Sequence, residues 1–291
     1  MSYNVLSDSY CGKDFTHGRY DYLSTAHLDI SYRCQVVYKE IVETYGCPGV
    51  LCLQECDEKV YTSYYSRLFS EQYCHNGGSN SIADLSTDLS AMKLTPCTVD
   101  SNKNQYCAHY TNKKGSAKEG CAMFIRPDKD SIGNVVAFID VDLSQVAKHY
   151  PVLQELYRLR ADIHDILVNK VGTIAQLGVC VRQESIQHDG DDTNSNATSA
   201  AGVNSASVEY VNDYTIISNT HLFFHPAAEY VRVLHMTLLF EVTKQLTTIL
   251  KDGTFSSLYN TDTEATFMNG CRIHWCCDPN IYNTPPASAP R

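Results

Sequence analysis

The sequence lacks the features that place a chain in a membrane or in a secretory pathway. None of its apolar runs approaches the length needed to cross a bilayer, and the opening MSYNVLSDSY has neither the basic nor the apolar region of a signal peptide. Positive charge is also scarce, because the formal net charge is −10. That balance argues against a protein that coats nucleic acid without regard to sequence, so any nucleic-acid site must be local.

The sequence also shows no sign of a disulfide framework, although cysteine itself is plentiful. The 13 cysteines are an odd number, and several lie in strand-like segments such as LCLQEC and EGCAMF. Buried free thiols of this kind are typical of a reducing compartment. We therefore predict an intracellular protein of the cytoplasm or the mitochondrion, with no membrane partner and no targeting signal in this chain.

Length and composition predict one large domain with polar insertions. With 291 residues, of which 43% are hydrophobic, the chain can bury a substantial core. Three polar stretches without hydrophobic period interrupt it, near residues 73–118, 187–207 and 252–269. We predict that these are surface insertions in a domain spanning residues 1–291. The second stretch is low in complexity, which indicates a disordered hairpin tip.

The remaining chain alternates between the two hydrophobic periods, as an α/β protein does. Apolar residues at helical spacing and short apolar or alternating runs mark the expected elements. Helices are predicted over residues 30–46, 60–69, 143–170 and 230–249, and strands over 2–6, 49–54, 121–126, 134–139, 173–182, 213–218 and 271–277.

The stretch at residues 213–236 joins a strand, a polar cluster and a helix without a gap. Its strand DYTIIS leads directly into Asn219 and His221, and a helix is expected soon after Pro226. Ligands of α/β proteins tend to lie outside the carboxyl ends of strands, and Asn and His are neutral donors suited to phosphate oxygens. The alternative is that His221 and His225 are packed histidines at a strand end, because position in a fold alone does not fix function.

Other strands carry further polar residues. Glu55 follows the apolar run GVLCLQ, Asp278 and Asn280 follow CRIHWCC, and Asn4 lies within the first expected strand. Carboxylates and amides that meet at one sheet edge suit a hard cation such as Mg²⁺, which leaves positions for water and phosphate. The residues expected to converge on one polar cleft are Glu55, Asn219, His221, Asp278 and Asn280.

The last predicted strand offers a second metal chemistry, that of zinc. Cys271, His274, Cys276 and Cys277 are all zinc-ligand types, but their spacing is not that of a closed structural site. Alternate residues of a strand also point to opposite faces of its sheet. We therefore favour the magnesium interpretation.

Taken in order, several motifs resemble the endonuclease/exonuclease/phosphatase superfamily. These are SYNVL, LCLQE, EGCAMFIR, SNTHL and a C-D-x-N strand end. Within that superfamily, LDISYR, KEGCAMFIR and NTHLFFHP followed by EYVRVLHM are similar to the 2′,5′-phosphodiesterase branch, whose relatives include deadenylases, nocturnin and Angel proteins. The resemblance covers nearly all of the chain outside the three polar stretches.

This resemblance implies a fold and an activity. The fold is a four-layer α/β/β/α arrangement, in which a sandwich of two sheets is flanked by helices. The activity is that of a phosphodiesterase or 3′-to-5′ exoribonuclease that depends on Mg²⁺, with Mn²⁺ as an alternative. Its substrate would be poly(A) RNA or 2′,5′-oligoadenylate, and no protein partner is implied.

The resemblance also implies a role for each matching residue. Glu55 would bind the metal, and Asn4 would support the metal and the phosphate. His221 and Asn219 would contact the scissile phosphate and stabilise its developing charge. Asp278 would orient or deprotonate the attacking water and Asn280 would hold phosphate or base, while Pro226, preceded by His225, would pack on the terminal base. Lys118, in the basic loop NKKGSAKEG, is either solvated or in contact with an RNA backbone.

The sequence departs from the family pattern at its last motif. The family reads C-G-D-F-N-S, whereas this chain has cysteine at position 277 and proline at position 279. The family also continues for roughly another hundred residues, well within the size of one large domain, to a closing Ser-Asp-His motif. We therefore expect this chain to be a fragment, incomplete at its C-terminal end. The alternative function is that of a non-catalytic remnant that binds RNA or a partner protein.

Overall fold

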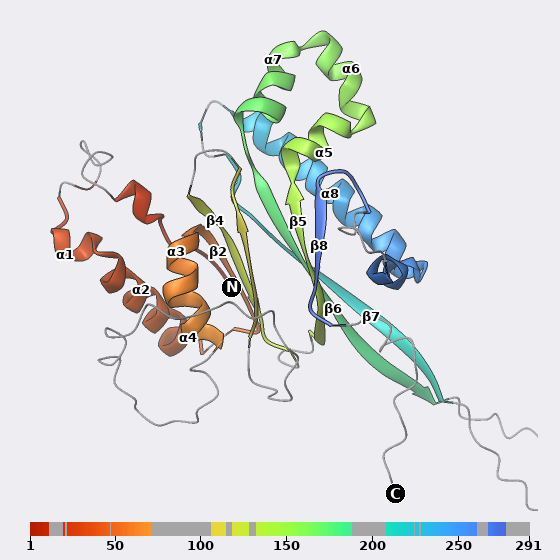
Figure 1. Ribbon diagram of the computed structural model, residues 1–291, viewed down its shortest axis with the longest axis horizontal. Coiled ribbons are helices and arrows are strands. Elements are labelled where there is room, and N and C mark those ends of the chain that lie inside the picture. Colours follow the sequence, from red (N-terminus) through yellow and green to blue (C-terminus); the bar gives the residue numbers. More distant parts are fainter. Residues whose placement is uncertain are drawn as a thin grey trace, which may run out of the picture.

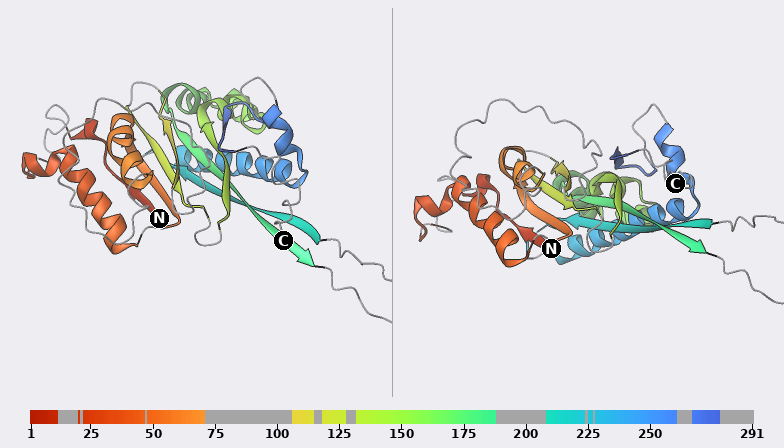
Figure 2. Two further views of the ribbon diagram at one scale, coloured as in Figure 1. Left: turned by 60° about the horizontal axis from the view of Figure 1, so that its bottom comes forward. Right: turned by 90° about the horizontal axis from the view of Figure 1, so that it is seen from below.

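The fold is a sandwich of two four-stranded sheets whose outer faces are covered by helices (Figures 1 and 2). The computed structural model describes residues 1–11, 20, 22–46, 48–70, 106–114, 118–127, 132–187, 208–223, 225–226, 228–260 and 267–277. Both sheets are mostly antiparallel, and the predicted fold class is confirmed.

The first sheet has the order β1-β2-β4-β3. Its short edge strand β1 (Ser2–Asn4) runs parallel to β2 (Val50–Asp57). The neighbouring strands β4 (Glu119–Ile125) and β3 (Cys107–Asn112) pair in antiparallel fashion. β1 and β2 therefore bring Asn4 and Glu55 to the same end of this sheet.

The second sheet has the order β7-β6-β5-β8, and all its pairs are antiparallel. Its strands are β5 (Asn134–Asp142), β6 (Ile174–Gln187), β7 (Val208–Thr220) and β8 (Cys271–Trp275). β6 pairs with β7 as far as Gln187 and Val208, whereas its pairing with β5 ends at Val181. The last residues of β6 and the first of β7 therefore form a two-stranded arm that projects beyond the sheet (Figure 2).

Short helices before and after β2 cover the outer face of the first sheet (Figure 1). They are α1 (Thr25–Leu28), α2 (Ile30–Lys39) with a π-helical continuation (Glu40–Thr44), α3 (Glu58–Val60) with a π-helical turn (Tyr61–Tyr65), and α4 (Ser66–Ser70). The carboxylate of Asp29 caps α2 by accepting the backbone N–H groups of Ser31 and Tyr32. The helix ends near Gly46, whose φ of +63° costs a glycine little.

The outer face of the second sheet is covered by the remaining helices. They are α5 (Leu143–His149), α6 (Pro151–Leu159), α7 (Ala161–His164) with a π-helical turn (Asp165–Lys170), and α8 (Glu229–Lys251). Among the residues described, no helix is both long enough and apolar enough to cross a bilayer.

Three separate hydrophobic cores account for the four layers. One lies between the first sheet and its helices, one between the two sheets, and one between the second sheet and its helices. Buried members are Ile41, Leu53 and Phe69 in the first core, Met123, Ile125 and Phe138 in the middle core, and Leu177, Val242 and Leu246 in the third. Each such side chain contributes about 1.5–3 kcal/mol when fully buried.

β4 shows why one strand of this fold reads as a continuous apolar run. Ala122 and Phe124 belong to the core under the helices, whereas Met123 and Ile125 belong to the core between the sheets. A strand covered on both faces has no side for polar residues. The motif EGCAMFI is therefore buried along its whole length.

The structure differs from the predicted insertions in two places. Within 73–118, β3 is an ordinary sheet strand, preceded by the buried Tyr106, whose hydroxyl donates to the Pro48 carbonyl at 2.5 Å. The sequence did not predict β3 as a strand because its polar residues resemble those of a loop. Two of them, His109 and Thr111, take part in hydrogen bonds between the sheets. Within 252–269, residues Thr254–Asn260 form a 3-10 helix that buries Phe255. Residues 188–207, where the hairpin tip was expected, lie outside the described part of the chain.

The cysteines follow the expectation of free thiols. Of the ten that the structure describes, six are buried. Burial in apolar surroundings raises the pKa of such thiols, as for Cys34, Cys52 and Cys180. At neutral pH they therefore remain protonated and unreactive.

Candidate functional site

Glu55 lies at a β-bulge inside β2. The pairing of β2 with β4 joins Leu53 to Ala122 but Cys56 to Gly120, so β2 contains one extra residue there. Glu55 has a φ of +54°, in the left-handed region. That conformation costs a non-glycine residue about 1–2 kcal/mol, and a bulge of this kind redirects a side chain. The strand does not end at Glu55, as the sequence suggested, but continues to Asp57.

The amide of Asn4 holds this bulge in place. Its Nδ2 donates to Glu55 Oε1 at 2.8 Å, and its Oδ1 accepts the backbone N–H of Leu6 at 2.9 Å. Leu6 also has a positive φ, of 57°. In the described part of the chain, Leu6 and Glu55 are the non-glycine residues with this conformation. One side chain therefore supports both strained positions, which explains the asparagine within a strand.

His221 faces the same carboxylate from the second sheet. It directly follows β7, and its Nε2 lies 3.4 Å from Glu55 Oε1. The side chains of His221 and Glu55 are 24% and 15% exposed, so both can be reached from solvent. Asn4, Glu55 and His221 thus meet at one edge of the sandwich, which we call the Glu55 edge.

Asn219 is close by but is buried between the sheets. Its Nδ2 donates to the carbonyls of Leu53 and Ala122 at 3.2 and 3.1 Å and to Gln176 Oε1 at 3.0 Å. Its Oδ1 accepts from Gln54 Nε2 at 2.8 Å. The amide is fully used within the protein, so the structure leaves it no free group for the phosphate contact that the resemblance implies. In this arrangement Asn219 ties the two sheets together beneath His221.

A buried line of hydrogen bonds continues from Asn219 through the sandwich. Gln176 Nε2 donates to Thr111 Oγ1 at 2.9 Å, and the Thr111 hydroxyl donates to Asp140 Oδ1. Polar groups enclosed between two sheets must be paired in this way, because an unpaired buried group costs about 1–3 kcal/mol. We call Gln54, Asn219, Gln176, Thr111 and Asp140 the polar line.

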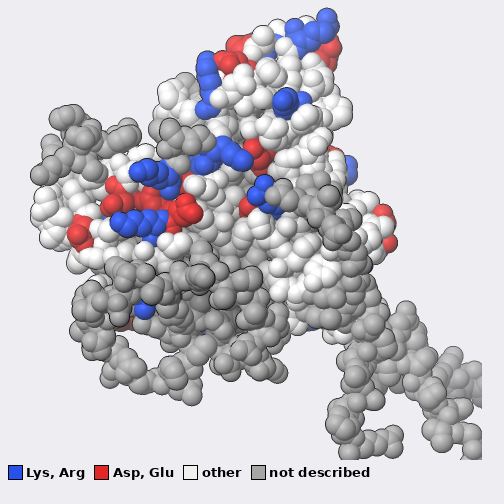
Figure 3. Space-filling view, viewed as in Figure 1, with Lys and Arg blue, Asp and Glu red and all other residues white. Residues whose placement is uncertain are grey.

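Negative charge gathers beside the Glu55 edge. Asp57 is buried and accepts from the Ser7 hydroxyl and the Asp8 backbone N–H at 2.7 and 2.6 Å. Glu119, opposite Asp57, forms an ion pair with Lys113 at 2.6 Å. Burial, the hydrogen bond to Glu119 and the nearby carboxylates together raise the pKa of Tyr10 well above its usual value. Acidic side chains flanked by basic ones are visible on the face of the molecule shown in Figure 3.

The predicted base-binding and backbone-binding residues lie at the surface. His225 and Pro226 are exposed, and the His225 ring stacks on Phe223 at 6.2 Å between centroids. The His225 carbonyl accepts from Arg232 Nη1 at 2.9 Å, which anchors this loop to α8. Lys118 is exposed, and its carbonyl accepts the backbone N–H of Glu58, just after β2.

Asp278 and Asn280 lie outside the described residues, so the predicted convergence of all five residues is not tested. The described end of β8 is informative nevertheless. Cys277 Sγ lies 3.7 Å from the Val135 carbonyl, at the start of β5, because β8 is antiparallel to β5. Val135 pairs with Cys180, whereas Thr220, just before His221, pairs with Ala175. The two partner residues on β6, Cys180 and Ala175, are about 17 Å apart at the usual rise per residue of a strand.

The Glu55 edge fits the kind of cation that the sequence predicted. Mg²⁺ prefers oxygen ligands, and one or two carboxylates together with water and phosphate suffice to hold it. Glu55 offers such a carboxylate at an accessible edge, already oriented by the Asn4 amide. The donor type therefore suits Mg²⁺ or Mn²⁺.

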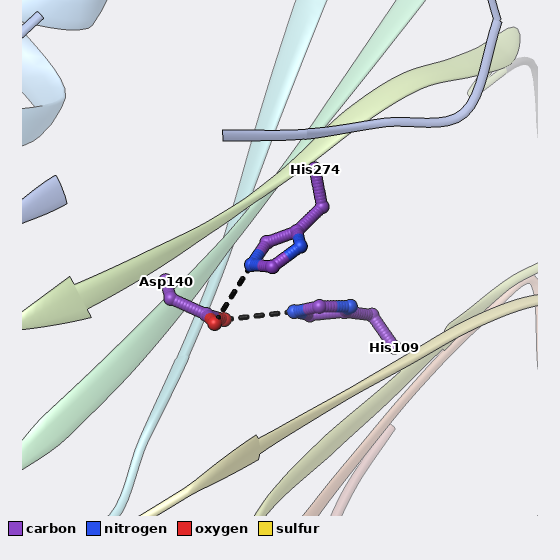
Figure 4. Close-up of side chains that lie close together, drawn as sticks. All are labelled: His109, Asp140 and His274. Atoms are coloured by element: carbon purple, nitrogen blue, oxygen red, sulfur yellow. Dashed lines mark hydrogen bonds and ion pairs between the residues drawn. The ribbon is translucent and has the colours of Figure 1, made fainter. Parts of the chain in front are cut away.

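A second cluster of ligand-type side chains lies at the other end of the polar line (Figure 4). His109 Nε2 and His274 Nε2 lie 2.7 and 2.9 Å from the two carboxylate oxygens of Asp140. Burial alone would raise the pKa of Asp140, but hydrogen bonds from His109 and His274 outweigh it and hold the pKa well below the usual value. Among the described residues, His109, Asp140 and His274 form a group of potential ligands that is compact enough to hold a metal ion.

Sequence reasoning missed this cluster. His109 fell in a predicted insertion, Asp140 followed the predicted strand NVVAFI, and His274 was considered only with its neighbouring cysteines. The alternation in CAHYTN was the available signal, because it places His109 and Thr111 on one face of a strand.

Comparisons with known proteins leave the family open. No protein-family model matches the chain, and no curated protein sequence matches it. Among solved structures, two crystal structures of ANGEL2, a 2′,3′-cyclic phosphatase, match with a TM-score of 0.45 at 16% identity, one of them in complex with adenosine-2′,3′-vanadate. The alignments cover 82% of this chain but only 45% and 44% of those chains. At that TM-score and identity, the likeness carries no argument about the function of this chain.

Proposed function

We propose that the chain carries the metal-binding and phosphate-binding part of a phosphodiesterase that acts on RNA ends or on 2′,5′-oligoadenylate. The observation that supports this proposal is the geometry of the Glu55 edge. An acidic residue is held in a strained backbone conformation by a dedicated amide, with an imidazole 3.4 Å from its carboxylate. Strain of this kind persists where the surrounding structure enforces it, often at sites of catalysis or binding.

Each residue of the Glu55 edge has a distinct part in the proposed reaction. Glu55 would hold Mg²⁺ or Mn²⁺, which supplies positive charge against the phosphate oxygens when bound. Asn4 fixes the rotamer of Glu55, so that the carboxylate is oriented before the cation arrives. His221 donates from Nε2 to a non-bridging phosphate oxygen, where its hydrogen bond strengthens as charge develops. Asn219 has no contact with substrate in this proposal, and it positions the nearby His221 by tying the two sheets together.

The loop after His221 provides the proposed contact with the nucleobase. The exposed His225 ring stacked on Phe223, followed by the exposed Pro226, presents flat surfaces to which a terminal base can pack. Lys118 borders the end of β2 and would meet the backbone of a longer RNA. Adenylate substrates are proposed on the basis of the motif NTHLFFHP and its resemblance to the 2′,5′-phosphodiesterase branch.

Asp278 and Asn280 complete the proposal as the groups for water and phosphate. β8 leaves its sheet about 17 Å along β6 from the level of His221, so these two assignments require their own test. Asp278→Asn should abolish turnover without changing metal affinity at Glu55. Unchanged turnover would remove Asp278 from the mechanism.

The experiment is digestion of a 3′-adenylated RNA and of a 2′,5′-linked oligoadenylate, each with Mg²⁺, with Mn²⁺ and with chelator. Glu55→Gln is the inactivating variant, and Glu43→Gln, exposed on the π-helical continuation of α2, is its matched control. We expect metal-dependent release of nucleotides by the wild type and the control but not by Glu55→Gln. If neither substrate is cleaved with either cation, the proposal is wrong, and RNA binding measured on the same samples decides for the non-catalytic alternative.

A further inference from the structure

We propose that His109, Asp140 and His274 form a binding site for a zinc-type transition-metal ion, separate from the Glu55 edge. This inference does not rest on the proposed function, because none of the three residues belongs to that edge. The three side chains come from β3, β5 and β8, so the site joins the edge strand of one sheet to two strands of the other (Figure 4).

The ligand types select the metal. Two imidazole nitrogens and one carboxylate oxygen suit Zn²⁺ and its neighbours in the first transition row, whereas Mg²⁺ prefers oxygen ligands alone. Sets of two histidines and one carboxylate occur at zinc sites that keep a fourth position for water or substrate. We therefore assign the fourth position to solvent.

The distances require only a small adjustment. All three ligand atoms lie within 4.8 Å of one another, and each imidazole Nε2 is within hydrogen-bond distance of one carboxylate oxygen. Ligand atoms around a tetrahedral zinc with bonds of 2.0–2.1 Å are about 3.4 Å apart. Nε2 binds the ion through its lone pair, so the proton that each neutral ring carries on Nε2 in the hydrogen-bonded state is then carried on Nδ1.

The surrounding groups orient the ligands in advance. The His109 ring lies against Phe138, with 5.1 Å between centroids and an angle of 14° between planes. Asp140 accepts from the Thr111 hydroxyl, which in turn accepts from Gln176. Metal-bound carboxylates typically accept such hydrogen bonds from groups that do not themselves bind the metal, and these bonds fix the orientation of the carboxylate.

The site is accessible to an ion. The side chains of His109, Asp140 and His274 are 15%, 25% and 38% exposed. A carboxylate between two imidazoles that opens to solvent can exchange its two hydrogen bonds for three metal bonds without unfolding the sheets. Bound zinc would fasten the short edge strand β8 to β3, and it would stabilise the folded chain by mass action.

The test is metal binding by the full chain after removal of metal with a chelator. Zn²⁺ is titrated in competition with a chromophoric chelator and in the presence of excess Mg²⁺, and Co²⁺ then replaces Zn²⁺ for absorption spectroscopy. We expect one tight equivalent and a cobalt spectrum without the intense absorption of thiolate ligation. Asp140→Asn and His274→Ala should each weaken binding by more than about 100-fold, because loss of an outer partner alone costs 10–100-fold.

His149→Ala, on the exposed end of α5, is the matched control and should bind as the wild type does. Thr111→Val should weaken binding about tenfold, since it removes the hydroxyl that orients Asp140. Far-UV circular dichroism checks folding, and where a variant unfolds, His274→Gln decides because its side chain is the most exposed of the three. Absence of tight binding, equal binding by all variants, or a thiolate spectrum would overturn the assignment.

Discussion

Asn4 and Glu55, 51 residues apart in the sequence, are joined by a hydrogen bond of 2.8 Å between an amide and a carboxylate. The bond crosses from an edge strand to a bulge in its neighbour, and it fixes the acidic side chain of Glu55, which faces His221. The local backbone is strained at both Leu6 and Glu55, and the amide contacts both. The Glu55 edge is therefore a preorganised arrangement rather than a chance contact of surface residues.

The first prediction concerns the donor side of that bond. Asn4→Asp replaces the donor amide by a second carboxylate, which repels Glu55 and releases its rotamer. We expect turnover to fall about 10–100-fold, as is usual when the partner of a metal ligand is lost. Turnover is measured at saturating Mg²⁺, with Asn169→Ala on an exposed helical turn as control. Equal activity of Asn4→Asp and wild type would show that the bond does not serve catalysis.

The second prediction separates strain from function at Glu55. Glycine adopts a positive φ without steric cost, so Glu55→Gly should match or exceed the wild type in free energy of unfolding, by up to about 1 kcal/mol, while activity is lost. Glu55→Gln keeps the strain and should not gain stability. Urea denaturation of both variants measures this difference. A Glu55→Gly variant that is clearly less stable than Glu55→Gln would mean that the left-handed conformation is not strained.

The third prediction concerns the polar line. Asn219→Ala removes the donor for two backbone carbonyls and for Gln176 Oε1, and it removes the acceptor of one hydrogen bond from Gln54. We expect the free energy of unfolding to fall by about 2–4 kcal/mol, since several buried polar groups become unpaired at once. Asn212→Ala, in the part of β7 that belongs to the arm, is the comparison on the same strand. A loss below about 1 kcal/mol would indicate that water replaces the amide.

The fourth prediction is a pH dependence that arises from His235 on α8. The side chain is fully buried, neither ring nitrogen has a hydrogen-bond partner among the described residues, and burial lowers its pKa from 6.5 to about 4. The unfolded chain therefore binds the proton more readily, so stability is full above pH 6.5 and declines as the pH falls towards 4. The decline should be on the order of 3 kcal/mol for this group.

His235→Leu removes the titrating group and should flatten the urea-denaturation midpoint over that range of pH. His149→Leu, at an exposed position, should keep the slope of the wild type. If His235→Leu loses stability with acid as steeply as the wild type, other groups cause the decline.

The fifth prediction concerns the segment between β6 and β7. Residues 188–207 are polar and low in complexity, so their composition cannot bury enough apolar area to offset the entropy of ordering. Gln187 and Val208 are paired, and a two-residue Asn-Gly turn can therefore replace the whole segment. The thermal midpoint should change by no more than a few degrees. A large decrease would show that the segment packs on the domain.

The sequence alone determined the class of fold and most of its elements. Two-sided apolar runs such as EGCAMFI predicted buried strands, and helical periodicity predicted the helices on either side, because burial of apolar area depends on local spacing. It also predicted that Asn4, Glu55 and His221 lie together, and the structure brings these three side chains to one edge. What the sequence could not show was how the bulge turns Glu55, since a register shift depends on the partner strand.

Only the tertiary structure decided which groups the polar residues between the sheets contact. Asn219 was expected to meet a phosphate, but packing of the second sheet on the first encloses its amide among Leu53, Ala122 and Gln176. His109, Asp140 and His274 are 31 and 134 residues apart, and no local pattern joins them. Sequence spacing fixes which face of a strand a side chain occupies, whereas the contact between two faces depends on how whole sheets are stacked.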